Sequence, residues 1–278
     1  MKTVEIPTNK DYSISANIYD VPKSTTVLII SSATGVKQSY YKKFAEFIRE
    51  KGISVITFDY LGIGKSLKEP LKNLNNTTVD WSKTDLSSVI NYTEQNYPES
   101  KITLLGHSIG GQLIGLSKSS TIAHKVILVA AQSGYWKFWK GFERYKLWIY
   151  WKILFPFLIK TFGYLPSKKI SGMENLPKNV AKQWIKWCLS PEYLFENIAE
   201  EDLFFKNIKI PLASFSIEND QFAPREAVDW LTKRYENAEI KKTHLMAKDF
   251  KTNDIGHFGI FREKFKENIW VLLLDEIK

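Results

Sequence analysis

A serine lies between two glycines at 106–110, in the order Gly-His-Ser-Ile-Gly. Glycine at these two positions permits the tight, strained turn that places a serine hydroxyl above the end of a strand. The pattern follows an apolar run typical of a buried strand, and a chain of this composition would contain it by chance only about 0.05 times. Ser108 is therefore the candidate nucleophile.

A serine hydroxyl is a weak nucleophile, and it needs a histidine that takes its proton and an acid that orients the histidine. When the serine follows a strand in this way, the acid and then the histidine come later in the chain, each after a further strand. Asp220 and His257 have this order and these positions. We predict that they complete a catalytic triad with Ser108.

Other residues of the same types fit these roles less well. Glu218 is the alternative acid, but it lies only one residue after a predicted strand, whereas Asp220 has the loop position from which a carboxylate reaches an imidazole. His107 precedes the serine within the turn and is expected to point away from it. His124 and His244 lie at the start of one predicted strand and inside another, where histidine is more often structural.

Attack of the serine on a carbonyl group also requires donors for the developing oxyanion. The first donor is expected to be the N–H of Ile109, at the start of the following helix. The second is expected from the small residues of the loop at 31–38. We predict the N–H of Thr34, with that of Gly35 as the alternative.

The elements that position these residues follow from hydrophobic periodicity. Apolar runs predict strands at 26–30, 53–58, 101–105, 125–131, 211–217 and 239–246. Helical patterns fall between most of them, at 40–50, 80–97, 112–119, 224–235 and 263–276. This alternation predicts an α/β fold with a mostly parallel sheet covered on both faces, and the alternating segments at 3–7 and 13–19 predict an antiparallel edge hairpin.

The segment 132–208 lacks any strand pattern and predicts a helical cap inserted after the sixth strand into a core formed by 1–131 and 209–278. It holds six of the nine tryptophans, and between 132 and 200 it has eleven basic residues against five glutamates. Tryptophans are well suited to binding an apolar substrate. The ones that we expect to do so are Trp136, Trp139, Trp148 and Trp184.

The composition limits the partners. The only cysteine is Cys188, and no histidines fall at metal-ligand spacing, so we expect neither a metal nor a cofactor.

The amino terminus lacks the apolar core of a secretory signal, which favours a cytoplasmic protein. The triplet at 64–66, Gly-Lys-Ser, is not a phosphate-binding loop, because Asp59 stands where that loop needs a glycine.

The net charge of +9 raises the question of an anionic partner. The apolar run at 147–159 contains Lys152 and Pro156 and is shorter than the roughly 20 residues of a membrane span. A lysine-rich surface also arises without any partner. The alternative is peripheral contact with an anionic membrane, which the tryptophan, tyrosine and lysine of this run would suit. Nucleic-acid binding is not expected, because no known nucleic-acid module is visible.

Several further motifs carry a resemblance to a known family. They are Ala-Thr-Gly-Val at 33–36 with Tyr-Tyr at 40–41, Phe-Asp-Tyr-Leu-Gly-Ile-Gly-Lys-Ser at 58–66, and Gln-Ser-Gly-Tyr-Trp at 132–136. With the serine motif, they make nearly the whole chain resemble an α/β hydrolase of the serine-aminopeptidase-like and monoacylglycerol-lipase-like branch, and within it a group of bacterial hydrolases. The resemblance implies the triad Ser108, Asp220 and His257 under a helical cap. Many relatives carry His-Gly where this chain has Ser32-Ala33.

These observations predict a serine hydrolase that cleaves a carboxylic ester, or a thioester or amide, through an acyl-enzyme intermediate. The aromatic cap favours a small-molecule, lipid-like substrate with an apolar acyl group. The alternatives are an acyltransferase with the same triad and a noncatalytic ligand-binding protein of the same fold. The sequence does not determine the oligomeric state.

Overall fold

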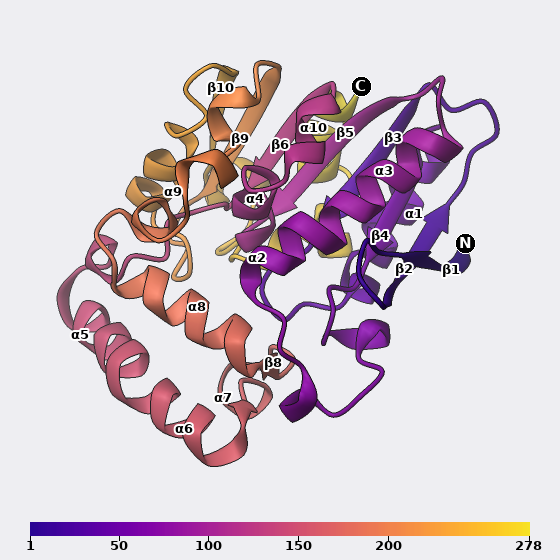
Figure 1. Ribbon diagram of the computed structural model, residues 1–278. Coiled ribbons are helices and arrows are strands. Elements are labelled where there is room, and N and C mark those ends of the chain that lie inside the picture. The colour runs from indigo at the N-terminus through magenta and orange to yellow at the C-terminus, as the bar shows by residue number, and fades with distance from the viewer.

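An eight-stranded sheet forms the centre of the computed structural model, which describes all residues from 1 to 278 (Figure 1). The strands follow one another in space as β1-β2-β4-β3-β5-β6-β9-β10. Their bounds are β1 Lys2–Pro7, β2 Ser13–Tyr19, β3 Thr26–Ser31, β4 Ser54–Phe58, β5 Lys101–His107, β6 Lys125–Val129, β9 Pro211–Ile217 and β10 Glu239–Leu245.

The sheet is parallel from β4 to β10, and β1 and β2 form the antiparallel hairpin expected at its edge. The central strands are buried along nearly their whole length because helices cover both of their faces. In β3, for example, every residue is buried. The predicted mixed α/β architecture is confirmed.

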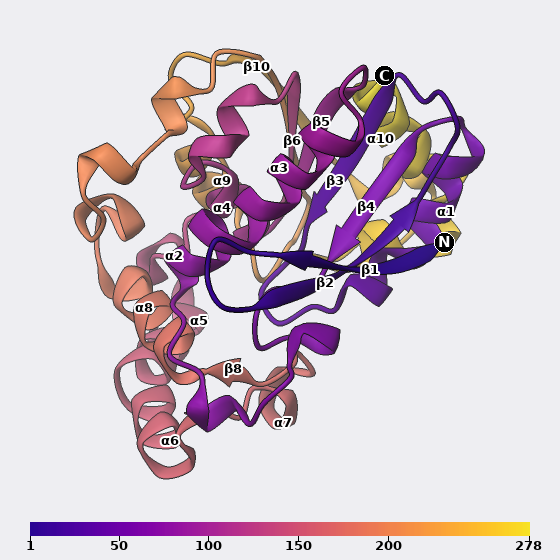
Figure 2. The ribbon, with the colours of Figure 1, turned by 45° about the vertical axis from the view of Figure 1, so that its right-hand side comes forward.

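Helices on the two faces bury separate apolar clusters. One cluster includes side chains of α3 and α4, and the other includes those of α1 and α10. Figure 2 shows these two helix layers on opposite sides of the sheet. The bounds are α1 Lys42–Glu50, α2 Thr78–Asp80, α3 Ser87–Asn96, α4 Ile109–Ile114, α9 Arg225–Thr232 and α10 Ile269–Ile277.

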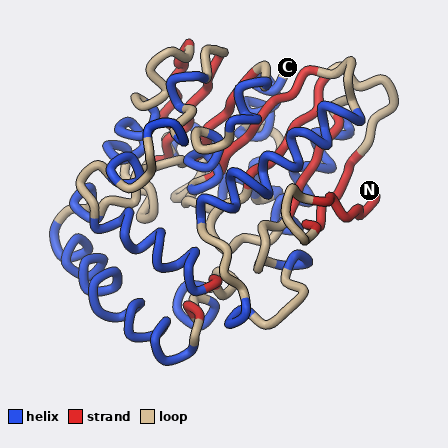
Figure 3. Tube along the Cα trace, viewed as in Figure 1, coloured by secondary structure: helices blue, strands red, loops and turns tan.

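The chain between β6 and β9 is mainly helical, as Figure 3 shows. It contains α5 Gly141–Ile149, α6 Phe155–Phe162, α7 Lys168–Ser171 and α8 Lys178–Leu189, and a π-helical segment, Tyr150–Leu154, joins α5 to α6. The expectation that this segment has no strand is wrong in one detail. The two-residue strands β7 Tyr164–Leu165 and β8 Leu176–Pro177 pair with each other. No helix of the structure has both the length and the apolar character needed to cross a membrane.

Helix α4 begins earlier than its predicted range of 112–119. The prediction placed the start too late because the first turn contains Gly110 and Gly111, and glycine disfavours a helix by propensity. Close packing requires both of them. A Cβ on Gly110 would lie 2.0 Å from the backbone oxygen of Ser31, and one on Gly111 would lie 2.4 Å from the Cβ of Ala131. The helix can therefore begin directly after Ser108.

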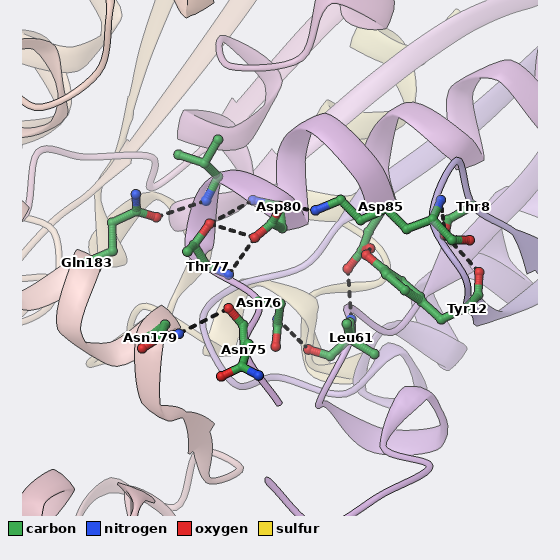
Figure 4. A network of polar contacts seen from close by, with 12 residues as sticks. Thr8, Tyr12, Leu61, Asn75, Asn76, Thr77, Asp80, Asp85, Asn179 and Gln183 are labelled. Carbon is green, nitrogen blue, oxygen red and sulfur yellow. Dashed lines mark hydrogen bonds and ion pairs between the residues drawn. The ribbon is translucent and has the colours of Figure 1, made fainter. Parts of the chain in front are cut away.

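A network of polar contacts joins α8 to α2 and to the loop that precedes α2 (Figure 4). The Asn179 side chain donates to the backbone oxygen of Asn75 at 3.0 Å, and Gln183 accepts the N–H of Val79 at 3.0 Å. These bonds fix α8 to α2 at one end of the insertion.

The same network continues to the amino-terminal hairpin through Asp85, which is completely buried. Its carboxylate accepts the hydroxyl of Tyr12 at 2.7 Å and the N–H of Leu61 at 2.8 Å. Burial raises the pKa of Asp85 from 3.8 to about 7, although these two donors oppose the shift.

Candidate active site

Ser108 occupies the turn between β5 and α4, with φ 55° and ψ −121°. A positive φ strains a residue that has a side chain, and such strain is common where a side chain must be held at a functional site. The turn is tight because a Cβ on Gly106 would lie 2.4 Å from the Cα of Gly111. This is the strained strand–turn–helix geometry expected from the sequence.

The parallel register brings the other predicted residues to the same edge of the sheet. Ser31 at the end of β3 pairs with Gly106 of β5, so the loop after β3 lies beside the Ser108 turn. Strand β9 continues the sheet from β6, and Asp220 follows three residues after its end. Ligand sites of open α/β sheets lie at this carboxyl edge.

Asp220 and His257 form a buried hydrogen-bonded pair. The Nδ1 of His257 lies 2.8 Å from Oδ2 of Asp220. The other carboxylate oxygen accepts the N–H groups of Phe222 at 2.8 Å and Ala223 at 3.0 Å. These two bonds fix the carboxylate, which in turn orients the imidazole and leaves Nε2 available as a base.

The alternative acid and bases lie in other contacts. Glu218 accepts the N–H of Ala247 at 2.9 Å instead of facing the imidazole. His124 accepts the N–H of Ile102 through Nδ1, and the Nδ1 of His244 contacts the Ser216 hydroxyl at 2.8 Å. Of the acids considered, the structure brings Asp220 to His257.

The hydroxyl of Ser108 donates to Oε1 of Gln132 at 3.4 Å rather than to His257. Gln132 is itself held by its side-chain N–H, which donates to the backbone oxygen of Phe222 at 3.0 Å. Ser108, Gln132 and His257 all line one cavity. In this structure the serine hydroxyl therefore contacts Gln132 and not the histidine. The sequence analysis gave Gln132 no role in the site.

The predicted oxyanion donors differ in their surroundings. The N–H of Thr34 has no protein acceptor, and Thr34 lines the cavity. The N–H of Ile109 is the first N–H of helix α4 and has no acceptor within the helix. The Ala33 N–H is occupied by the Tyr41 hydroxyl at 3.0 Å. Neither Gly35 nor Ile109 is among the residues that line the cavity.

His107 takes part in a buried chain of hydrogen bonds behind the site. Its Nε2 donates to the backbone oxygen of His257 at 3.1 Å, so its Nδ1 accepts the hydroxyl of Tyr41 at 2.8 Å. Burial holds the pKa of His107 well below its ordinary value, and the ring is neutral. Through these bonds His107 and Tyr41 connect Ala33 to His257, and the sequence analysis did not anticipate this connection.

A cavity of about 320 Å³ lies between the sheet edge and the insertion. Its apolar wall includes Trp139, Leu147, Tyr150, Trp151, Phe155 and Trp184. The rings of Trp151 and Trp184 meet edge to face, with centroids 4.8 Å apart. An aromatic wall of this kind suits an apolar ligand.

Only two of the four tryptophans that we expected to bind substrate line this cavity, namely Trp139 and Trp184. The prediction for the other two does not match the geometry. Trp148 lies on the exposed side of α5, and Trp136 lies in a short turn with the Lys137 ammonium over its ring. Trp151, which we did not select, lies in the wall.

Together, the mostly parallel sheet, the serine turn at its carboxyl edge and the buried histidine–carboxylate pair define the class of α/β hydrolases. A family model described as serine aminopeptidase, S33, matches residues 22–183, which is more than half of the chain. The chain therefore belongs to the serine aminopeptidase S33 family of hydrolases. The match includes Ser108 and the loop after β3, and it ends before Asp220 and His257.

Solved structures share this fold over the whole chain. A thermostable carboxyl esterase from Bacillus coagulans, in complex with glycerol, has a TM-score of 0.65 and 13% identity, and covers 100% of this chain and 99% of its own. DcsB in complex with its substrate analogue has a TM-score of 0.65, 16% identity and coverages of 99% and 97%. Est1E from Butyrivibrio proteoclasticus, with ferulic acid bound, has a TM-score of 0.58, 18% identity and coverages of 99% and 99%. No curated protein sequence matches this chain.

Proposed function

We propose that this hydrolase cleaves carboxylic esters with an apolar acyl group, using Ser108, His257 and Asp220 as its triad. The observation that carries the proposal is the convergence of three features on one cavity. Ser108 and His257 both line it, Asp220 orients the imidazole at 2.8 Å, and the opposite wall is aromatic. Similar solved structures include a carboxyl esterase and Est1E with ferulic acid bound, which agrees with ester chemistry.

In the first half of the reaction, Ser108 turns from Gln132 toward His257, and its Oγ attacks the ester carbonyl carbon. Nε2 of His257 takes the hydroxyl proton, while Asp220 stabilises the imidazolium. The negative oxygen of the tetrahedral intermediate accepts hydrogen bonds from the N–H groups of Ile109 and Thr34. The bond to the alcohol oxygen then breaks, and His257 gives its proton to the leaving alcohol.

In the second half, water attacks the acyl-serine. His257 removes one proton from the water, and the same two N–H groups stabilise the second oxyanion. Collapse returns the proton to Ser108 and releases the carboxylic acid. The triad that serves this ester reaction also fits a thioester or an amide, with a thiol or an amine as leaving group.

We further propose that the segment 132–208 acts as a cap that supplies the acyl-binding wall. The cavity of about 320 Å³ is at the lower end of the roughly 300–1,000 Å³ usual for ligand pockets. Its rim includes two exposed apolar side chains, Ile170 and Phe222. A short or medium acyl group is therefore the expected occupant.

Labelling with a fluorophosphonate, followed by turnover of p-nitrophenyl esters of rising chain length, tests the proposal. We expect one probe molecule per chain, attached to Ser108, and loss of both labelling and turnover in Ser108→Ala by several orders of magnitude. The matched control is Ser120→Ala, because the Ser120 hydroxyl is buried without a hydrogen-bond partner. Turnover by Ser108→Ala within about threefold of wild type would contradict the assignment.

A further inference from the structure

The helices α5 and α6 carry apolar side chains on the side that faces away from the rest of the molecule. Five of them follow one another at intervals of three or four residues, and we call these the apolar stripe: Phe142, Tyr145, Ile149, Ile153 and Phe157. Phe142 is 79% exposed and Phe157 is 63% exposed. Figure 1 shows both helices at the outer edge of the molecule, with no element covering their outer side.

The stripe is not required for packing of the insertion, because the opposite side of the same helices already provides the packing. Trp151, Phe155 and Ile159 are buried there, and Trp184 of α8 contacts Trp151. Helices with apolar residues on two sides normally bury both of them. A contiguous exposed patch of large apolar side chains marks a surface for association.

The charge around the stripe has a single dominant sign. Residues 137–169 contain eight basic side chains and one acidic one, Glu143, which forms an ion pair with Lys146. Lys140 and Lys168 form ion pairs with glutamates outside this segment. Lys152 and Lys160 lie on the exposed side of these helices and form no ion pair within the protein. The segment 137–169, which contains the stripe, thus has a formal charge of +7, against a net charge of +9 for the whole chain.

We propose that the apolar stripe docks α5 and α6 onto the surface of an anionic lipid bilayer. The two helices would lie in the plane of the headgroups, with the stripe among the upper acyl segments and the lysines at the lipid phosphates. This occupant fits the charge better than a second copy of the chain, because a symmetric contact would bring like-charged lysines together. The inner sides of the same helices line the cavity of Ser108, so docking would place that cavity next to lipid.

Co-sedimentation with vesicles tests the proposal. We expect the wild-type protein to bind vesicles of phosphatidylcholine mixed with phosphatidylglycerol, to bind pure phosphatidylcholine much more weakly, and to lose anionic binding as salt rises. Ile153→Glu with Phe157→Glu should weaken binding by at least about tenfold. Lys152→Gln and Lys160→Gln should each weaken it by about fivefold.

The matched control is Leu272→Glu, on α10, because Leu272 is also an exposed apolar residue but lies on a helix outside the stripe. It should bind anionic vesicles like the wild type. Thermal unfolding of each variant checks that it is folded, and turnover of a short, water-soluble ester should stay within about twofold of wild type. Turnover therefore tests the proposed hydrolysis independently of docking.

Absence of wild-type binding to either kind of vesicle would overturn the proposal. Equal losses in the stripe variant and in Leu272→Glu would also overturn it. If light scattering shows a dimer that Ile153→Glu with Phe157→Glu dissociates, and vesicles are not bound, the stripe is a surface for self-association instead.

Discussion

At the scale of single residues, the site depends on the carboxylate of Asp220, whose two oxygens accept hydrogen bonds from different donors. One oxygen of Asp220 is held by two backbone N–H groups, and the other accepts from His257. Glu218, two residues earlier, is engaged by the N–H of Ala247. The two acids are therefore not interchangeable, although the sequence places them side by side.

Replacing Asp220 by Asn should lower kcat by about four orders of magnitude, because an amide at this position favours the wrong imidazole tautomer. Glu218→Gln is the matched control and should keep kcat within about threefold of wild type. Initial rates with a p-nitrophenyl ester measure both effects. The acid assignment is wrong if Glu218→Gln loses activity and Asp220→Asn retains it.

We propose that Tyr41 is a positioning residue, because its hydroxyl joins Ala33 of the loop after β3 to His107, which lies behind the proposed catalytic residue His257. Tyr41→Phe should lower kcat by about tenfold with little change in KM, since it loosens groups that act in the transition state. It should also destabilise the fold by about 1–3 kcal/mol, because a buried N–H and a ring nitrogen lose their partner.

Tyr12→Phe separates these two effects of Tyr41→Phe. It removes another hydrogen bond of a partly buried tyrosine, to Asp85, at a distance from the cavity. We expect it to lower the unfolding free energy while kcat stays at the wild-type value. An unchanged kcat in Tyr41→Phe would reduce Tyr41 to a purely structural residue.

At the scale of elements, the insertion is fixed to the core through α2 and α8, and α2 continues into the helical turns that contain Asp85. Asp85 lies where the amino-terminal hairpin, the loop after β4 and these turns meet. Its neutral form is favoured because burial penalises the charge more than the two donors compensate. The stability of this junction should therefore depend on pH.

The pKa of Asp85 is raised from 3.8 to about 7 in the folded protein, so its contribution to stability is complete below pH 4 and is lost as the pH rises through 7. Over this range the unfolding free energy of the wild type should fall by about 4 kcal/mol relative to Asp85→Asn, which cannot ionise. Urea unfolding at a series of pH values measures the difference. Asp11→Asn, an exposed acid of the same hairpin, serves as the control. A pH-independent difference between wild type and Asp85→Asn would contradict the prediction.

At the scale of the whole molecule, the cavity is built from both parts of the chain. The sheet edge provides Ser108 and His257, and the insertion provides most of the aromatic wall. The acyl preference of the enzyme should therefore be set by α5, α6 and α8, whereas the chemistry is set by the loops of the sheet.

Trp184→Leu should change this preference. The smaller side chain opens the wall beside Trp151, so kcat/KM for the longest p-nitrophenyl esters should rise relative to the shortest by about tenfold. Trp148→Leu, in which the ring faces away from the cavity, should leave the chain-length profile unchanged. Identical profiles for Trp184→Leu and wild type would show that Trp184 does not limit the acyl pocket.

The sequence alone determined the parts that depend on local pattern. Strand and helix periodicity predicted the mostly parallel sheet with its antiparallel edge, because a buried strand must be apolar along its length. The glycines around Ser108 predicted its strained turn, because few other residues permit such close packing. The order of Ser108, Asp220 and His257 followed from the regular connections of a parallel sheet.

The tertiary structure alone decided which side chains face one another. The π-helical segment at 150–154 changes the phase of the helix, so a regular 3.6-residue period could not show that Trp151 faces the cavity and Trp148 faces outward. The contacts of Gln132 with Ser108, and of His107 with Tyr41 and His257, join residues 24 to 150 positions apart. No local pattern encodes such contacts, because they arise only when distant strands meet at one edge of the sheet.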